Sequence, residues 1–419
     1  NVASIALYRV FQQSQGQVMA KPMFLRKLKN RIFFAMAKVI AGKPKGNYMA
    51  FVGKASCARL CDRIVELGHT SVLVVTDRAL RDLGLADEAV AGLNREGVTL
   101  SWYDKVDPDP TYGHVEEGAR ILKESGATAI LAVGGGSSID CAKVIAFRKY
   151  NDGDMTKWAG MGNGPDEAAP LFVIPTTSGT GSEATMGAVI TNQASHKKEI
   201  IGGEAIHPKA VALDACLMVG LPKPITAATG IDALTHGIEA YISTWERGNR
   251  TEMGRISVQG VFRWLRLACE EPGNMDAREG MALAAYNAGV AINQVNVGNV
   301  HAIAHQLGAN FGIPHGHANA LVLPHVLTLY GDTAVDRLAE LAVATGISDS
   351  GHPETRARAF IAEVEKLIAD VGIAPTDPRI KRDKFDVIAE AAMDEGDGYF
   401  CPRQLEKSEI LNLLEAISE

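Results

Sequence analysis

The chain has 419 residues and a formal net charge of −7, and 47% of its residues are hydrophobic and 22% are charged. This is the composition of a globular protein, and the length predicts two or three domains. The acidic balance argues against nucleic acid as a partner, and no run of 18 uncharged apolar residues predicts a transmembrane helix.

Residues 1–47 are predicted to form a basic amphipathic extension. The first acidic residue is Asp62, and the 61 residues before it contain 11 Lys or Arg. Residues 22–41 place several of these among apolar residues at roughly helical spacing. Such a helix docks on an anionic membrane or a partner, acts as a targeting sequence, or packs on its own subunit, and all these interpretations stay open. The six cysteines lack zinc-ribbon spacing, which favours reduced thiols in a cytoplasmic protein.

From residue 48 the pattern alternates between short apolar runs and amphipathic segments. Runs rich in β-branched residues indicate buried parallel strands, and alternating helices indicate a doubly wound α/β domain. We therefore predict a Rossmann-like domain over 48–219. Its expected strands lie at 49–53, 71–77, 98–104, 127–136 and 171–177, and its expected helices at 54–68, 86–97 and 114–126.

Beyond residue 220 the strand pattern disappears, and long stretches rich in Ala, Leu and Glu follow. The two prolines of LPKPIT, residues 221–226, favour a domain boundary. We predict an all-helical second domain over 220–419. Its expected helices lie at 226–243, 251–270, 277–310, 316–330, 333–345, 353–371 and 383–394.

Two loops that follow predicted strands have the composition of nucleotide-binding loops. The first, in AILAVGGGSSIDCAK, joins a strand to a helix through glycines, which let a phosphate approach the backbone and the helix N-terminus. The second, IPTTSGTGSEAT, offers hydroxyl and amide groups that suit phosphate or ribose. The candidate cofactor residues are Gly134, Gly135, Gly136, Ser137, Ser138 and Asp140 in the first loop, and Thr176, Thr177, Ser178, Thr180 and Ser182 in the second.

Asp77 stands at the end of the strand predicted at 71–77. An acidic residue at this place accepts hydrogen bonds from an adenosine ribose and repels a 2′-phosphate, which favours NAD over NADP. A helix-capping role explains the residue equally well.

Histidines and one aspartate have the spacing of a metal site. Asp232 and His236 are four residues apart in GIDALTHGIEAYIS, and His301 and His305 are four apart in HAIAHQLGANFGIPHGH, which also contains His315. Residues four apart share one face of a helix. One carboxylate with several imidazoles suits Fe(II), Zn(II) or Mn(II) and is poor for Ca²⁺ or Mg²⁺.

These motifs, in this order, resemble the iron-containing (group III) alcohol dehydrogenases. The resemblance rests on GGGSSIDCAK, PTTSGTGSE, ATGIDALTHGIEAYIS and VHAIAHQLGANFGIPHGHANALVLPHV, and it covers about residues 48–419. It implies a dehydroquinate synthase-like architecture, in which a Rossmann-like NAD domain precedes an all-helical metal-binding domain, and it implies a homodimer.

The resemblance also assigns roles to residues. It implies that Asp232, His236, His301 and His315 bind the metal, that Lys198 lies near the cofactor, and that His305 is a candidate proton relay; the candidate catalytic residues are thus His305, Asp232 and His301. Asn299 and Gln306 depart from the usual family pattern, and we hypothesise that they suit a substrate with a second oxygen.

The implied activity is an NAD-dependent oxidoreductase that interconverts a primary alcohol and its aldehyde with Fe(II), Zn(II) also fitting the ligands. A hydroxyacid–oxoacid transhydrogenase is an alternative, as is a membrane- or partner-docking role of the extension. A third alternative, elimination from phosphorylated sugar acids, needs basic residues in the pocket, and the metal motifs contain none.

Overall fold

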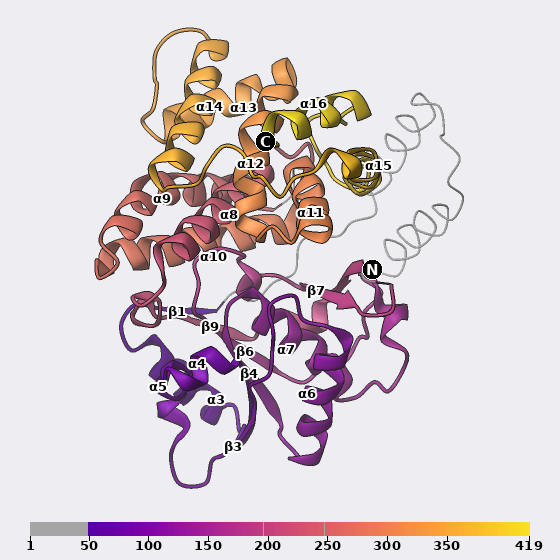
Figure 1. Cartoon of the computed structure of the whole chain (residues 1–419). Helices are drawn as coiled ribbons and strands as arrows, with labels where there is room; N and C mark the ends of the chain where they lie inside the picture. The colour runs from indigo at the N-terminus through magenta and orange to yellow at the C-terminus, as the bar shows by residue number, and fades with distance from the viewer. Residues whose placement is uncertain (1–48, 196, 247) are drawn as a thin grey trace.

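The computed structural model describes residues 49–195, 197–246 and 248–419. The predicted basic extension at 1–47 lies outside these residues. The described part divides into a sheet-containing half and a helical half, as predicted, and Figure 1 shows the helical half above the sheet. Among the described residues, no helix combines the length and apolar character needed to cross a membrane.

The first half is built on six parallel strands in the order β1-β9-β6-β4-β2-β3. Side chains alternate between the two faces of each strand, so Leu73 and Val75 pack on one face of the sheet and Val72 and Val74 on the other. The strands are β1 (Ala50–Val52), β2 (Ser71–Val75), β3 (Thr99–Tyr103), β4 (Ala129–Gly134), β6 (Leu171–Pro175) and β9 (Ala210–Leu213).

Helices cover both faces of this sheet, which is the predicted doubly wound arrangement (Figure 1). Helices α6 (Tyr112–Glu124) and α7 (Gly136–Arg148) pack on one face, and α3 (Ser56–Glu66) packs on the other with α5 (Leu85–Ala89). The helix predicted at 86–97 is wrong in length. Only α5 and a 3₁₀ turn at 91–93 form there.

A second sheet, in the order β5-β8-β7, was not predicted. Its strands are β5 (Gly160–Met161), β7 (Gly187–Asn192) and β8 (Lys197–Gly202), of which β7 and β8 pair antiparallel. Short strands such as β5 leave little periodicity in a sequence, because two residues do not define an alternation.

The register between β4 and β6 brings the two predicted loops together. Gly134 pairs with Pro175, and the Thr176 amide donates to the Gly134 carbonyl at 3.0 Å. Because the strands are parallel, both loops leave the sheet at the same edge, at the carboxyl ends of the strands. Open α/β sheets bind ligands at this edge.

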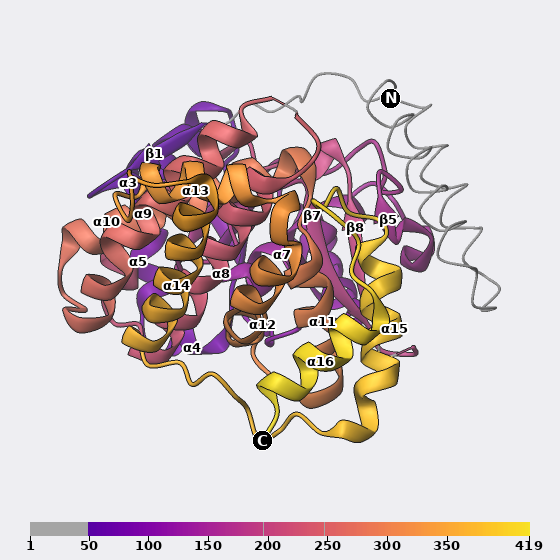
Figure 2. The same cartoon turned by 90° about the horizontal axis from the view of Figure 1, so that it is seen from above.

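The second half consists of nine α-helices among the described residues. Its central helix, α8, has apolar or small residues around its whole circumference, and 15 of its 20 residues are buried. Figure 2 shows α9 and α10 on one side of α8 and α15 and α16 on the other. The helices are α8 (Lys223–Ile242), α9 (Arg250–Glu270), α10 (Met275–Val295), α11 (Asn299–Phe311), α12 (His315–Tyr330), α13 (Val335–Ala344), α14 (Pro353–Asp370), α15 (Phe385–Gly396) and α16 (Lys407–Ile417).

The single helix predicted over 277–310 is wrong, because α10 and α11 are separate helices. The chain leaves α10 at Asn296, whose φ of 69° is incompatible with a right-handed helix, and α11 begins after Gly298. With a ψ of −174°, Asn296 adopts a conformation that is almost restricted to glycine, so an asparagine at this position was no signal of the break. The break directs α11, and with it His301, toward α8.

Candidate metal centre and nucleotide cleft

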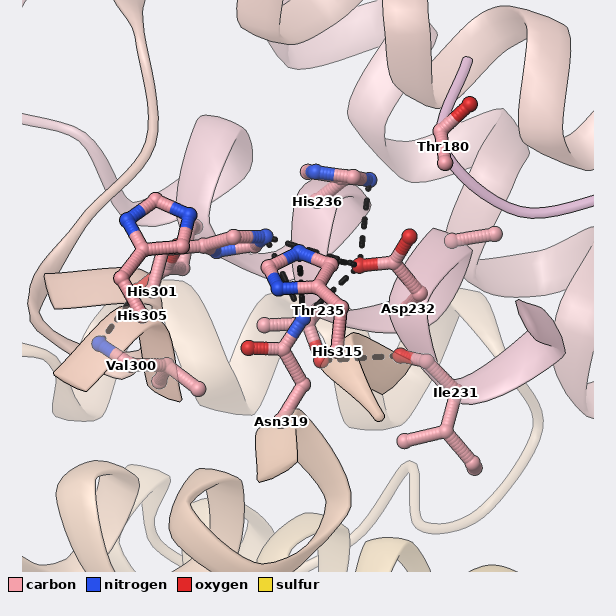
Figure 3. A network of polar contacts seen from close by, with 12 residues as sticks. Thr180, Ile231, Asp232, Thr235, His236, Val300, His301, His305, His315 and Asn319 are labelled. Carbon is pink, nitrogen blue, oxygen red and sulfur yellow. Dashed lines mark hydrogen bonds and ion pairs between the residues drawn. The ribbon is translucent and has the colours of Figure 1, made fainter. Parts of the chain in front are cut away.

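Three helices bring Asp232, His236, His301 and His315 together, as predicted for a metal site. Each residue offers one ligand atom, and these atoms lie within 4.8 Å of one another. From Asp232 Oδ1 the distances are 3.3 Å to His315 Nε2, 3.6 Å to His301 Nε2 and 3.8 Å to His236 Nδ1. Figure 3 shows the four side chains converging from α8, α11 and the start of α12.

The chemistry of this cluster fits a divalent cation. Burial lowers the pKa of His236 to about 3 and also lowers the pKa of His315, so both rings are held neutral. His236 Nδ1 is buried and has no hydrogen-bond partner among the described residues. Neutral imidazoles beside a carboxylate are the usual protein ligands of Fe(II) and Zn(II).

The charge of Asp232 is stabilised by its neighbours. Burial alone raises the pKa of this carboxyl, but His236, His315 and His301 together hold it well below its ordinary value. The carboxylate is only 2% exposed, and a buried anion needs such partners or a cation. Asp232 is therefore anionic at neutral pH, as a carboxylate that binds a cation must be.

Glu239 orients His301, and the sequence analysis did not identify it. Its carboxylate accepts hydrogen bonds from the Gly298 and Val300 amides, both at 2.8 Å, and lies 2.6 Å from His301 Nδ1. These contacts turn His301 Nε2 toward Asp232. Burial alone lowers the pKa of His301, but Glu239 and Asp232 raise it to about 9. The available signal was spacing, because Glu239 follows His236 by three residues on the same helix.

Asn319 is a second unpredicted residue of the cluster. Its Nδ2 donates to Asp232 Oδ1 at 2.7 Å and lies 3.3 Å from His301 Nε2 and 3.4 Å from His315 Nε2. Figure 3 shows this amide beneath the converging ligands. An N–H donor and a cation use the same lone pairs, so the amide and a metal compete for these atoms. Asn319 follows His315 by one helical turn, which was the available signal.

One cleft of about 2180 Å³ joins the cluster to the sheet edge. All four clustered residues line it, together with His305. Most of the candidate cofactor residues also line it: Asp77, Gly135, Gly136, Ser137, Ser138, Asp140, Thr176, Thr177, Thr180, Ser182 and Lys198.

The first loop needs glycine for steric reasons. A Cβ at Gly136 would lie 2.7 Å from Thr180 Cγ2, and a Cβ at Gly134 would lie 2.6 Å from Ser138 Oγ. Gly136 thus lets the two loops approach each other, and Gly134 lets the first loop fold closely onto the start of α7, where free backbone amides and the helix dipole favour a phosphate.

Several candidate cofactor residues also make structural contacts. The Ser182 hydroxyl and the Val189 amide hydrogen-bond to the Asp140 carboxylate, which ties α7 to the second loop and to β7. Ser178 does not line the cleft, because its hydroxyl points to Met218 Sδ at 3.0 Å. Lys198, on β8, forms an ion pair with Asp109 at 2.5 Å at the cleft wall.

Asp77 caps helix α4 (Arg78–Asp82), so the capping interpretation is confirmed. Its Oδ1 accepts a hydrogen bond from the Leu80 amide at 3.0 Å. The same side chain lines the cleft, so this contact leaves the ribose interpretation open.

The hypothesis about Asn299 and Gln306 is wrong, because neither residue lines the cleft. Asn299 is 4% exposed, and its Nδ2 donates to the Arg403 carbonyl at 3.0 Å. Gln306 donates to Glu395 at 3.0 Å. Both amides are turned toward the C-terminal segment, which the sequence spacing did not place near α11.

Comparison with known proteins agrees with this geometry. The model of the iron-containing alcohol dehydrogenases matches residues 48–215, and that of the C-terminal part of the Fe-containing alcohol dehydrogenase family matches 226–418. The chain belongs to the iron-containing alcohol dehydrogenase family. The resemblance predicted from the motifs is thereby confirmed, and this family uses NAD and a divalent metal ion.

Individual relatives match over most of their length. Alcohol dehydrogenase 4 of Schizosaccharomyces pombe is 36% identical over 85% of this chain and 85% of its own. The 1,3-propanediol dehydrogenase of Citrobacter freundii is 35% identical over 87% of this chain and 95% of its own. A crystal structure of 1,3-propanediol oxidoreductase superposes with a TM-score of 0.85 at 34% identity, over 89% of this chain and 99% of that one.

Proposed function

We propose that this family member interconverts a primary alcohol and its aldehyde by hydride transfer to and from NAD. The observation that supports this most directly is that one cleft contains both the Asp232 cluster and the two loops at the sheet edge. A hydride donor and acceptor must meet at close range, so a metal-binding cluster and a dinucleotide-binding edge in one cleft suit this reaction.

In this proposal Asp232, His236, His301 and His315 bind Fe(II), or Zn(II) in its place. When bound, such a metal supplies Lewis-acid polarisation of the alcohol or aldehyde oxygen. Glu239 keeps the His301 ring oriented, and the Asp232 charge offsets part of the cation's charge.

The residues of the α/β half would hold the cofactor. The amides at Gly135 and Gly136 and the hydroxyls of Thr176 and Thr180 suit the pyrophosphate, and the Asp77 carboxylate suits the adenosine ribose. His305, which lines the cleft one turn after His301, would accept the alcohol proton in oxidation and return it in reduction.

The test measures NADH formation at 340 nm by protein that is purified anaerobically, stripped of metal and reloaded with Fe(II) or Zn(II). A panel of primary alcohols and diols is used, and bound metal is determined in every state. We expect NADH formation that requires metal and that His236→Ala abolishes. The matched control is His69→Ala, because His69 lies outside the cleft and contacts Thr128 and Phe172.

Metal-loaded protein that forms no NADH from any alcohol contradicts the proposal. In that case, hydride exchange between a hydroxy acid and an oxo acid without release of NAD would favour the transhydrogenase alternative.

A further inference from the structure

Glu395, on α15, gathers three polar groups beside the cleft without lining it. Its Oε1 lies 2.5 Å from His305 Nδ1 and accepts a hydrogen bond from the Tyr399 hydroxyl at 2.7 Å. Its Oε2 accepts a hydrogen bond from Gln306 Nε2 at 3.0 Å. Two of these groups come from α11, which also carries His301. The carboxylate therefore connects the C-terminal segment to the helix at the centre of the cleft.

The contact with Glu395 decides the tautomer of His305. Burial alone raises the pKa of the Glu395 carboxyl, but His305 and the hydrogen bonds from Tyr399 and Gln306 lower it below its ordinary value. An ionised carboxylate only accepts hydrogen bonds, so His305 Nδ1 must carry the proton. In the neutral ring, Nε2 then keeps its lone pair.

A second contact fixes the plane of the same ring. His305 stacks on His315 with ring centroids 5.2 Å apart and planes 19° apart. The hydrogen bond to Glu395 and this stack restrain both the position and the rotation of the imidazole. Tyr399 and Gln306 in turn restrain the carboxylate, so the restraint does not depend on one flexible side chain.

We propose that Glu395 is a positioning residue, which holds His305 as the Nδ1-protonated tautomer with Nε2 available to accept the substrate proton. This inference rests on the proposed function, in which His305 is the proton relay. A base whose far nitrogen is held by a carboxylate is a general arrangement in proton-transfer sites, because it sets both tautomer and orientation. The proton moves from the alcohol oxygen to Nε2, and no proton passes to Glu395.

Gln306 gives this chain a hydrogen bond to Glu395 that the usual family pattern does not provide. The resemblance to the family implies a proline at this position, and a proline has no side-chain amide to donate to Glu395. The additional donor restrains Oε2, which would otherwise be free to rotate away from α11.

The test compares two identical substitutions. Glu395→Gln keeps the shape of the side chain but replaces a carboxylate, which only accepts hydrogen bonds, by an amide that can either accept from His305 Nδ1 or donate to it, so the tautomer of His305 is no longer fixed. Glu340→Gln is the matched control, because Glu340 also accepts a tyrosine hydroxyl at 2.7 Å, from Tyr241, but contacts no histidine among the described residues and lies outside the cleft. Tyr399→Phe removes a single donor and serves as a milder variant.

Three measurements are made on each variant: steady-state kinetics with metal-loaded protein, which give kcat and KM; the solvent isotope effect on kcat; and the ¹⁵N shifts of the His305 ring in metal-free protein. For Glu395→Gln we expect kcat to fall about tenfold, which is part of the roughly 10²–10⁴-fold that a positioned acid–base residue contributes. We expect its KM to stay within about a factor of two, because Glu395 does not line the cleft. The solvent isotope effect should rise, and the ¹⁵N shifts should move from the Nδ1-protonated tautomer to a mixture. Glu340→Gln should resemble the wild type in all three.

An unchanged kcat in Glu395→Gln, or an equal fall in Glu340→Gln, would overturn the inference and leave the contact a structural link between helices. An unchanged ¹⁵N tautomer would overturn it as well, and this readout needs no turnover. A wild type that is inactive with every metal counts instead against the proposed function, so the two failures are distinguishable.

Discussion

Substitution of Glu239 by Gln tests whether this carboxylate organises the metal cluster. Glu239 is 4% exposed, and its two oxygens accept from the Gly298 and Val300 amides and contact His301 Nδ1. A glutamine has only one acceptor oxygen. If this oxygen replaces Oε2, the bond from Val300 is lost; if it replaces Oε1, the contacts with Gly298 and His301 are lost.

The magnitude follows from this count. At least one buried N–H donor then faces an amide N–H₂, and an unsatisfied buried donor costs about 1–3 kcal/mol. The orientation of His301 is also weakened, and the loss of such a partner typically lowers metal affinity by about 10–100-fold. We therefore expect both a lower free energy of unfolding and weaker metal binding.

Urea unfolding of the metal-free protein measures the first effect, and competition against a chromogenic chelator measures the second. Glu340→Gln again provides the control, since this glutamate is half exposed on α13 and contacts Tyr241 and Arg337. A Glu239→Gln protein that binds metal as tightly as the wild type would refute the argument that Glu239 orients His301. A large loss of stability with unchanged metal affinity would restrict its role to the helix contact.

Three further predictions concern the nucleotide loops and the pH dependence. Asp77→Gly should relax the preference for NAD over NADP. It should lower stability by only a few tenths of a kcal/mol, since glycine replaces a capping residue at about that cost. A variant that still rejects NADP in kcat/KM measurements excludes Asp77 as the determinant. Gly136→Ala should weaken NADH binding measured by fluorescence titration, because overpacking costs about 1–3 kcal/mol. Gly153→Ala should have no effect, because an added Cβ there meets no described atom within 4 Å. The pKa of His301 is raised to about 9, so its contribution to stability is present below about pH 6.5 and is lost as the pH rises through 9. The pKa of His236 is lowered to about 3, so its contribution is present above about pH 6.5 and is lost as the pH falls through 3. The unfolding free energy of metal-free protein should thus peak near pH 6.5. Calorimetry at pH 7.5 in two buffers should detect release of about one proton on metal binding. A flat pH profile of stability, or metal binding without proton release, would contradict the assigned protonation of His301.

The sequence predicted which residues gather in the cluster because much of their pattern is encoded locally. Asp232 and His236 share a helix face because they are four residues apart, and the glycines after β4 stand where a parallel strand must end. Composition and periodicity likewise predicted the alternating first half and the helical second half. These features depend only on neighbours along the chain, so they can be read without knowledge of the packing.

The tertiary structure alone decided which residues support the site. Glu239 and His301 are 62 residues apart, Asn319 and Asp232 are 87 apart, and Glu395 and His305 are 90 apart, and no local pattern pairs them. The break at Asn296 decided the direction of α11, and the packing of the C-terminal segment turned Asn299 out of the cleft. Local sequence sets which side chains a helix presents on each face. The packing of the helices, which depends on the burial of the whole apolar core, sets which face meets which partner.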